Sequence, residues 1–536
     1  MTYTAVTFAP VQSFIRASRK LRDLYGSSLL LSHLARALAD DANSRPGITV
    51  ISPASVDSSR GVPNVLVIGG DYRKGHAKAA LLASWRHVLE ECRRWLEGAL
   101  KGSEIAPANW EQSWGASWKA CAHHTWELFH GQGSTIQEAR QALAVNKQQR
   151  DWSVPNWTGE SSTLSSAEAV VWPGMGAVRD PRELPPGEIS KQAREFLNDL
   201  RRHPGLGEAF ASDREEIALT ELVKRLVTYT VVAGKAFATA SDPSPPILKL
   251  IPERFQATSS RGDQGDPPES IVWFMADGDG IGDHLHSLTQ KNGEREALHS
   301  FSQKMRSWAA DLYERVPAVM GSQAMVVYAG GDDLLGALHE TKPGANDLTT
   351  EHLWRWLRQF PQIWKQCDQE NLTVSMGLVW ADAQVPQREA LQHARDAEVS
   401  AKARGKDRFA LRLLYANGNH LEWTCPWEWL DPILSHYTDR EGRSLKTSRD
   451  GRPPSWRHLA EDLQWLQSRQ AIAADRTVKR HPVSEALLQA YFPGWKPPRD
   501  PEEGEGRTID QWLLDLGRVM AGLEKHTPKS TRGDQR

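Results

Sequence analysis

The chain has 536 residues, of which 40% are hydrophobic and 25% charged, and its formal net charge is −2. A chain this long exceeds what one hydrophobic core supports, so we expect three or four domains of a soluble globular protein. Its near-neutral charge excludes a bulk polyanion binder, so any nucleic acid must be held by local patches or through partner chains.

The four cysteines lie far apart in the sequence, and no two of them have the CxxC spacing. No apolar run is long enough to span a membrane, and the first residues lack the basic and apolar regions of a signal peptide. We therefore expect a cytoplasmic protein without disulfides and without a four-cysteine zinc site.

Residues 1–105 predict a first compact domain that contains both strands and helices. Residues 3–8 alternate as a strand, Pro10 opens a helical stretch, and a second helix follows from Ser27. Short strands are expected near residues 50 and 65–68, before a long helix over 77–100. This order favours a compact βα domain.

Two further segments follow before the next apolar strand. Residues 106–257 have a mainly helical pattern and predict an intermediate domain. Residues 258–268 contain no apolar side chain and are rich in Gly, Pro and Ser, which predicts a linker.

Residues 269–413 predict a second domain, which begins with the continuously apolar strand 271–276. Helices and strands then follow in the order β-α-β-β-α-β, which is typical of the ferredoxin-like fold. Residues 414–536 read as a helical C-terminal domain. The expected fold class is α+β, with two ferredoxin-like domains and two helical ones.

The motif Gly330-Gly331-Asp332-Asp333 joins two apolar strands of the second domain. Glycine accepts the positive φ of a tight hairpin, but adjacent carboxylates repel each other and are unfavourable in strands. In a ferredoxin-like sheet, strand one lies beside this hairpin, so Asp277 at its end should approach both acids. Three carboxylates suit two Mg²⁺ or Mn²⁺ ions, as in nucleotidyl transfer.

Two other features of this domain bear on nucleotide binding. Gly330 and Gly331 would let a nucleotide approach the backbone closely, and Gly278 follows the first acid. Lys402 ends the last helix of this domain, where it either pairs with the helix C-terminus or contacts a triphosphate.

The GGDD-bearing domain resembles the palm domain of the large subunit of type III CRISPR effector complexes. Residues 8–24, 26–32 and 62–64 resemble the Cmr (type III-B) version of that subunit. The resemblance implies two palm domains, a helical intermediate domain and a helical C-terminal domain. It also implies cyclic oligoadenylate synthesis between the palms, in which a 3′-hydroxyl of one ATP attacks the α-phosphate of another and pyrophosphate leaves.

The same resemblance implies partners and further site residues. The partners would be the other Cmr-type subunits, which bind the guide RNA and form the backbone, together with crRNA and a target RNA whose pairing switches on synthesis. Residues 10–32 would belong to the first palm and hold the acceptor ATP, with Ser27 and Ser28 as candidates. Many relatives begin with a His-Asp nuclease domain; because no His-Asp dipeptide occurs here, we expect no DNA cleavage by this chain.

Two alternatives to a synthase remain open. The chain could be a catalytically silent scaffold that only anchors the guide-RNA-binding subunits, although the intact acids and glycines argue against this. It could also be a free-standing nucleotide cyclase of the GGDEF type, which the Cmr-like start and the two palms disfavour.

Overall fold

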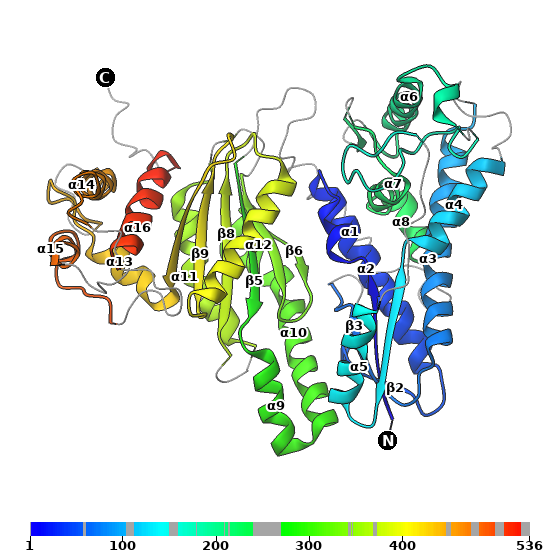
Figure 1. Ribbon diagram of the computed structural model, residues 1–536, viewed down its shortest axis with the longest axis horizontal. Helices are drawn as coiled ribbons and strands as arrows, with labels where there is room; N and C mark the ends of the chain where they lie inside the picture. Colours follow the sequence, from blue (N-terminus) through cyan, green and yellow to red (C-terminus); the bar gives the residue numbers. More distant parts are fainter. Residues whose placement is uncertain are drawn as a thin grey trace. The chain divides into compact units, whose positions relative to one another are not determined.

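Figure 1 shows the computed structural model, in which the chain forms two compact units. Unit 1 comprises residues 1–266, 285–310 and 327–331, and unit 2 comprises residues 267–284, 311–326 and 332–536. No helix among the described residues is long and apolar enough to cross a membrane. The structure describes residues 2–56, 61–102, 112–149, 159–177, 180–207, 210–212, 215–238, 270–340, 345, 347–367, 372–445, 452–472, 482–498 and 509–526; the predicted linker, 258–268, lies outside them.

Unit 1 is built on a four-stranded antiparallel sheet with the order β2-β3-β1-β4. Its elements follow the chain order β-α-β-β-α-β, so this sheet is ferredoxin-like, with helix α5 added at the end. The strands are β1 (Tyr3–Ala9), β2 (Thr49–Ser52), β3 (Val65–Gly69) and β4 (Glu127–Gly133), and the helices are α1 (Gln12–Arg16), α2 (Leu21–Asn43), α3 (Lys74–Ala99), α4 (Gln112–His124) and α5 (Ile136–Gln148).

Strand β4 corrects the predicted end of the first domain at residue 105, because it lies in the range 106–257 that was expected to be helical and pairs with β1 along its whole length. Two glycines make this strand hard to recognise, since glycine is depleted in strands. A Cβ at Gly131 would lie 2.8 Å from Leu143 Cα, and one at Gly133 would lie 2.6 Å from Ala139 N. The glycines therefore let helix α5 lie directly on the strand backbone.

The remaining helices of unit 1 include part of a helix from much later in the chain. The first half of α10 (Glu294–Met320) clusters with unit 1, where Leu298 is buried with Ile51, Val67 and Ile136. The Glu294 carboxylate accepts the N–H groups of Ile136 and Gln137, at 2.9 and 2.8 Å, and so caps the start of α5. The other elements of unit 1 are η2 (Pro181–Glu183), α6 (Glu188–Arg202), α7 (Leu219–Leu226) and α8 (Thr230–Ala236).

Helix α7 holds the bend between α1 and α2 with a buried lysine. Lys224 is 1% exposed, and its ammonium donates to the carbonyl of Phe14 and, at 2.9 Å, to that of Ala17. These carbonyls belong to the C-terminal end of α1, where backbone acceptors lack intrahelical donors. The ammonium also lies 4.1 Å from the centre of the Phe14 ring. Burial lowers the pKa of Lys224 to about 8, although nearby carboxylates oppose the shift.

A fully buried ion triad lies beside this lysine. Arg225 Nε and Nη2 donate to the Asp23 carboxylate at 2.8 and 3.0 Å, and Nη1 donates to Glu215 at 2.8 Å. The side chains of Arg225 and Glu215 are 0% exposed and that of Asp23 is 1% exposed. Burial alone would raise the pKa of Asp23, but the Arg225 charge outweighs it and holds this pKa below its ordinary value. The triad therefore joins α2 to α7 through charges that have no access to water.

Unit 2 is built on a six-stranded sheet with the order β10-β9-β8-β5-β7-β6, of which the last residues of β6, 327–329, cluster with unit 1. β5 pairs antiparallel with both β7 and β8, so the predicted ferredoxin-like arrangement is confirmed for the second domain. β8 and β9 are parallel, and β9 and β10 are antiparallel. The strands are β5 (Ile271–Gly278), β6 (Ala324–Ala329), β7 (Leu334–His339), β8 (Val374–Ala381), β9 (Arg408–Leu414) and β10 (His420–Pro426).

Helix α12 (Gln387–Ala403) lies against β8 and β9 (Figure 1) and carries the buried alanines Ala397 and Ala401 on that face. Strand β10 corrects the expectation that residues 414–536 are wholly helical. The other helices before the C-terminal region are α9 (Ile281–Asn292), η5 (Gly321–Gln323) and α11 (Thr350–Lys365).

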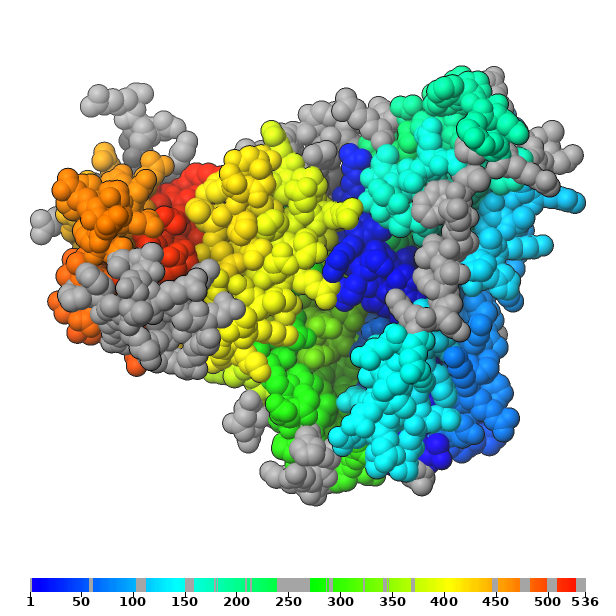
Figure 2. All heavy atoms as spheres, in the orientation of Figure 1, coloured from blue at the N-terminus to red at the C-terminus, as the bar shows by residue number. Residues whose placement is uncertain are grey.

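The C-terminal helices pack on the outer end of this sheet. Helix α16 (Ile509–Leu523) covers β10, and Trp512 Nε1 donates to Thr424 O at 2.8 Å; in Figure 2 the red atoms of α16 meet the yellow atoms of the sheet. The other elements are η6 (Trp427–Trp429), α13 (Leu430–His436), α14 (Arg457–Ser468), α15 (Pro482–Tyr491) and η7 (Glu524–His526).

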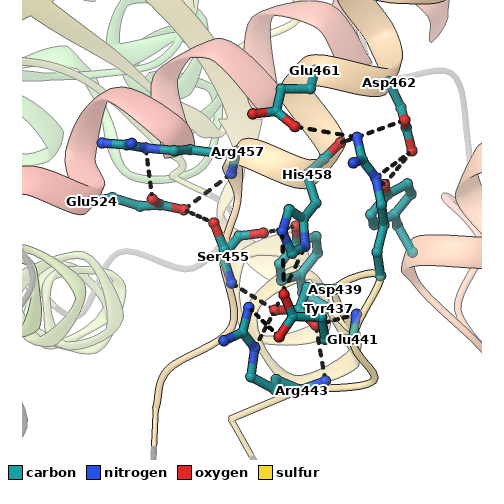
Figure 3. A network of polar contacts seen from close by, with 12 residues as sticks. Tyr437, Asp439, Glu441, Arg443, Ser455, Arg457, His458, Glu461, Asp462 and Glu524 are labelled. Atoms are coloured by element: carbon teal, nitrogen blue, oxygen red, sulfur yellow. Dashed lines mark hydrogen bonds and ion pairs between the residues drawn. The ribbon is translucent and has the colours of Figure 1, made fainter.

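A polar network joins the two described parts, residues 437–445 and 452–456, of the segment between α13 and α14 (Figure 3). Asp439 is 4% exposed and accepts the N–H groups of Glu441, Arg443 and Ser455 at 2.9 to 3.0 Å. Burial opposes ionisation of Asp439, but these donors hold its pKa below the ordinary value. Arg443 Nε also donates to Asp439 Oδ2 at 2.8 Å, so both carboxylate oxygens of Asp439 accept hydrogen bonds from this segment.

Candidate active site

The predicted acids all lie in unit 2, at one end of its sheet. Asp277 is the penultimate residue of β5, and Asp332 and Asp333 lie in the turn between β6 and β7. The turn takes the shape expected from its glycines. Gly331 has φ +127°, and the position of a Cβ there has no heavy atom within 4 Å. No protein atom therefore fills the space beside the Gly331 Cα, although the residue itself is buried.

Lys402 is the residue that connects Asp277, on β5, to helix α12. Its ammonium donates to Asp277 Oδ2 and lies 2.9 Å from Oε1 of Glu398, one turn earlier on α12. Burial, followed by the charge of Lys406, lowers the pKa of Lys402. Lys402 thus contacts a predicted catalytic acid rather than the end of its own helix, and its contact to a triphosphate stays a prediction.

Three carboxyl groups of the site have raised pKa values, because their surroundings disfavour the ionised form. Burial, followed by the charge of Asp333, raises the pKa of Asp332 to about 6. Burial among protein atoms also raises the pKa of Asp333, although its side chain still reaches solvent and the charge of Arg395 opposes the shift. Burial, followed by the charge of Asp333, raises the pKa of Glu398 to about 7. Glu398 is thus paired with Lys402 and interacts electrostatically with Asp333.

The donor set fits a hard divalent cation in its chemistry. It offers carboxylate oxygens only, in a partly buried place where added positive charge would relieve repulsion. Within the described ranges, however, no three His, Cys, Asp or Glu side chains are gathered closely enough to hold a metal ion. Lys402 supplies the positive charge at Asp277, so the convergence of Asp277, Asp332 and Asp333 on metal ions stays a prediction.

Asp279 has a different role from Asp277, two residues earlier in the chain. Its carboxylate accepts hydrogen bonds from Thr373 Oγ1 (2.9 Å), Ser375 Oγ (2.8 Å) and the backbone N–H of Asp407 (3.0 Å). Lys406 and Asp407 both have positive φ, at 61° and 47°. Asp279 therefore anchors the strained loop between α12 and β9, which immediately follows the helix that carries Lys402.

The other predicted nucleotide-binding residues have packing partners of their own. A Cβ at Gly278 would lie 2.9 Å from Ile281 and 3.0 Å from Trp364, so side chains of α9 and α11 occupy that side of the glycine. In unit 1, Ser27 is fully buried and its hydroxyl donates to Asp23 O at 2.7 Å, and Ser28 is 8% exposed. Their predicted roles in binding nucleotide remain untested by these contacts.

Glu398 is the residue of this site that sequence reasoning missed. A glutamate four residues before a lysine on a helix is the usual pattern of a solvent-exposed ion pair. Nothing in that pattern distinguishes it from other surface pairs, such as Arg36 and Asp40 on α2. Only the sheet order, which brings β5 and the β6–β7 turn beside α12, gives Glu398 its place.

Comparisons with known proteins identify two segments of the chain. Residues 271–410 match the second palm domain of Cas10/Cmr2, and residues 3–63 match the N-terminal domain of the CRISPR-associated protein Cmr2. The first match spans β5, the acidic turn, Glu398 and Lys402. A search of curated proteins finds no match.

Solved structures are similar along almost the whole chain. A type III-B Cmr-beta structure in the apo state matches 98% of this chain and 82% of its own, with a TM-score of 0.54 and 11% identity. The Csm1–Csm4 subcomplex of the type III-A CRISPR–Csm interference complex matches 97% and 69%, with a TM-score of 0.47 and 14% identity. The Csm1–Csm4 cassette with one ATP matches 97% and 70%, with a TM-score of 0.47 and 13% identity.

The likeness to Cmr-beta shows the shared fold, and the two domain matches show which domains the matched segments resemble. The predicted resemblance to the Cmr-type large subunit of type III effector complexes is confirmed. The chain thus contains a segment that matches the Cmr2 N-terminal domain, over residues 3–63, and one that matches the second palm domain of Cas10/Cmr2, over residues 271–410.

Proposed function

We propose that this protein is the large subunit of a type III-B CRISPR effector complex that synthesises cyclic oligoadenylate from ATP when the complex binds target RNA. One observation carries the proposal. The segment that matches the Cas10/Cmr2 second palm contains Asp277, the GGDD turn and an α12 whose Lys402 and Glu398 connect the two.

The reaction is a nucleotidyl transfer. The 3′-hydroxyl oxygen of one adenylate attacks the α-phosphorus of an ATP, the bond to the β-phosphate bridging oxygen breaks, and pyrophosphate leaves while the hydroxyl proton passes to solvent or a base. Repetition lengthens the chain, and attack by its own terminal 3′-hydroxyl closes the ring.

Asp277, Asp332 and Asp333 would hold two Mg²⁺ or Mn²⁺ ions, which when bound activate the attacking hydroxyl and stabilise the leaving pyrophosphate. The chain itself supplies the rest of the site. Because Gly331 has no side chain and no heavy atom lies within 4 Å of its Cβ position, the phosphates would approach the backbone there at close range. Lys402, which is held between Asp277 and Glu398, places a positive charge where the triphosphate would enter. Asp279 keeps the loop that follows Lys402 in a fixed conformation.

The partners would be the guide-RNA-binding and backbone subunits of a Cmr-type complex, with crRNA and a target RNA. The near-neutral charge of the chain is consistent with RNA held mainly by those partner subunits.

The test uses the assembled complex with ATP, Mg²⁺ and target RNA, and separates the products by chromatography. We expect cyclic oligoadenylate from the wild type, none from the variant Asp332→Ala/Asp333→Ala, and unchanged assembly of both. Asp311→Ala, an exposed acid on α10, serves as the matched control. No product from the wild type would leave a silent scaffold, and RNA-independent activity of the isolated chain on GTP would favour a GGDEF-type cyclase.

A further inference from the structure

We propose that Gly61 and Tyr328 are positioning residues that together hold the GGDD turn in place. Both belong to unit 1, which contains residues 327–331 as well as the loop that leads into β3. A Cβ built at Gly61 would lie 2.9 Å from Ala329 O and 3.0 and 3.1 Å from two ring carbons of Tyr328. Gly61 therefore packs its Cα directly against the last residues of β6.

The loop that contains Gly61 is fixed from several sides. The Gly61 carbonyl accepts a hydrogen bond from Arg306 Nη1 on α10, and Arg306 is 4% exposed. The next residue, Val62, donates its N–H to Ser32 Oγ on α2 at 3.0 Å. Asn64 Nδ2 then donates to Thr7 Oγ1 on β1 at 3.1 Å. Because three different elements hold this loop, it presents a rigid surface to Tyr328.

Tyr328 connects this loop to the GGDD turn, because its ring contacts both. A Cβ at Gly330 would overlap the Tyr328 hydroxyl, so the tyrosine side chain lies over the backbone of the first glycine of GGDD. The ring is thus packed between Gly61 on one side and Gly330 on the other. A side chain at either glycine would move the ring or the turn, and the two acids follow Gly331 directly in the chain.

Displacement of the turn should weaken catalysis more than binding. Relief of the contact at Gly61 requires the turn to shift by a few tenths of an ångström, and a displacement of about 1 Å can cost roughly 100-fold in rate. For Gly61→Ala we therefore expect kcat to fall by about tenfold, with little change in KM for ATP. This kinetic expectation rests on the proposed synthase function.

The chain offers a matched control for the backbone strain of this substitution. Gly47 has φ +72°, identical to Gly61, but a Cβ there meets nothing within 4 Å. Gly61→Ala and Gly47→Ala therefore carry the same conformational cost, and only the first presses on Tyr328 and Ala329.

The experiment compares wild type, Gly61→Ala and Gly47→Ala as assembled complexes, with hydrogen exchange of the peptide covering residues 324–339 and steady-state kinetics with ATP. We expect faster exchange at the turn and lower kcat in Gly61→Ala alone. If Gly61→Ala matches Gly47→Ala in both measurements, the proposal is overturned. Should Gly61→Ala fail to assemble, Tyr328→Leu removes the ring contact and must raise exchange at the turn. A wild type without synthase activity would refute the proposed function, while the exchange result still decides the role of Gly61.

Discussion

The buried lysine on α7 makes the stability of unit 1 depend on pH in a way that can be calculated. Lys224 is charged at neutral pH, yet it is almost fully buried and bound to two carbonyls and an aromatic ring. Lys224→Met retains the apolar stem and removes the titrating group, so the difference between wild type and variant isolates its contribution.

The sign follows from the two pKa values. The folded-state pKa of Lys224 is about 8, below the ordinary value of 10.5, so between these pH values the unfolded chain binds more protons. The stability of the wild type therefore rises with pH over this interval. The interval from pH 7 to pH 9.5 extends about 1.5 pH units above the folded-state pKa. The free energy of unfolding of the wild type, relative to that of Lys224→Met, should therefore increase by about 2 kcal/mol over this interval.

Urea unfolding at pH 7 and pH 9.5, followed by hydrogen exchange of peptides from α1, α2 and α7, measures this difference. The exposed Lys191 on α6 provides the control, and Lys191→Met should give the same difference from wild type at both pH values. A change below about 0.5 kcal/mol for Lys224→Met, or one of opposite sign, would show that this amine is not desolvated as its contacts imply.

Three other substitutions test the packing and charge of the two units. Arg225→Met leaves two buried carboxylates without their cation and should cost about 3–5 kcal/mol in urea unfolding, whereas Arg202→Met, which removes a 77% exposed side chain paired with Asp199, should cost under about 1 kcal/mol. Equal costs would contradict the buried triad. Above pH 8, where Glu398 with its pKa of about 7 is ionised, Glu398→Gln removes one negative charge near the acidic turn, so Mn²⁺ binding measured by electron paramagnetic resonance should weaken roughly tenfold; unchanged affinity would place Glu398 outside the site. Gly26→Ala puts a Cβ 2.8 Å from the Lys224 carbonyl carbon and should lower stability by about 1–3 kcal/mol, and a neutral result would mean that α2 and α7 can separate without cost.

The second domain was predictable because its strands are unusually apolar. β5 and β7 are buried along most of their length, so their sequences show continuous hydrophobic runs that end at Asp277 and begin after Asp333. Their pairing in the ferredoxin-like order follows from topology alone. The location of the candidate site therefore could be inferred before its geometry was known.

Other features depend on tertiary contacts that leave no local pattern. β4 contains two glycines because α5 rests on its backbone, and that reason is visible only in the packed structure. Asp279 resembles Asp277 in sequence, but its three hydrogen-bond donors come from residues about 100 positions later. Ser27 looks like a polar helix residue that could bind a ligand, yet its hydroxyl is satisfied within its own helix.

The return of the chain to unit 1 after its first 266 residues has a practical consequence for dissecting the protein. A gene fragment that stops at residue 257 would lack Leu298, which completes an apolar cluster, and Glu294, which caps the start of α5. Ribosomes must likewise synthesise at least 310 residues before the part of α10 that belongs to this unit is available, and 331 before all of the unit is. Truncation at residue 257 would therefore yield an incompletely folded, aggregation-prone polypeptide. An expression fragment for unit 1 has to include the first half of α10.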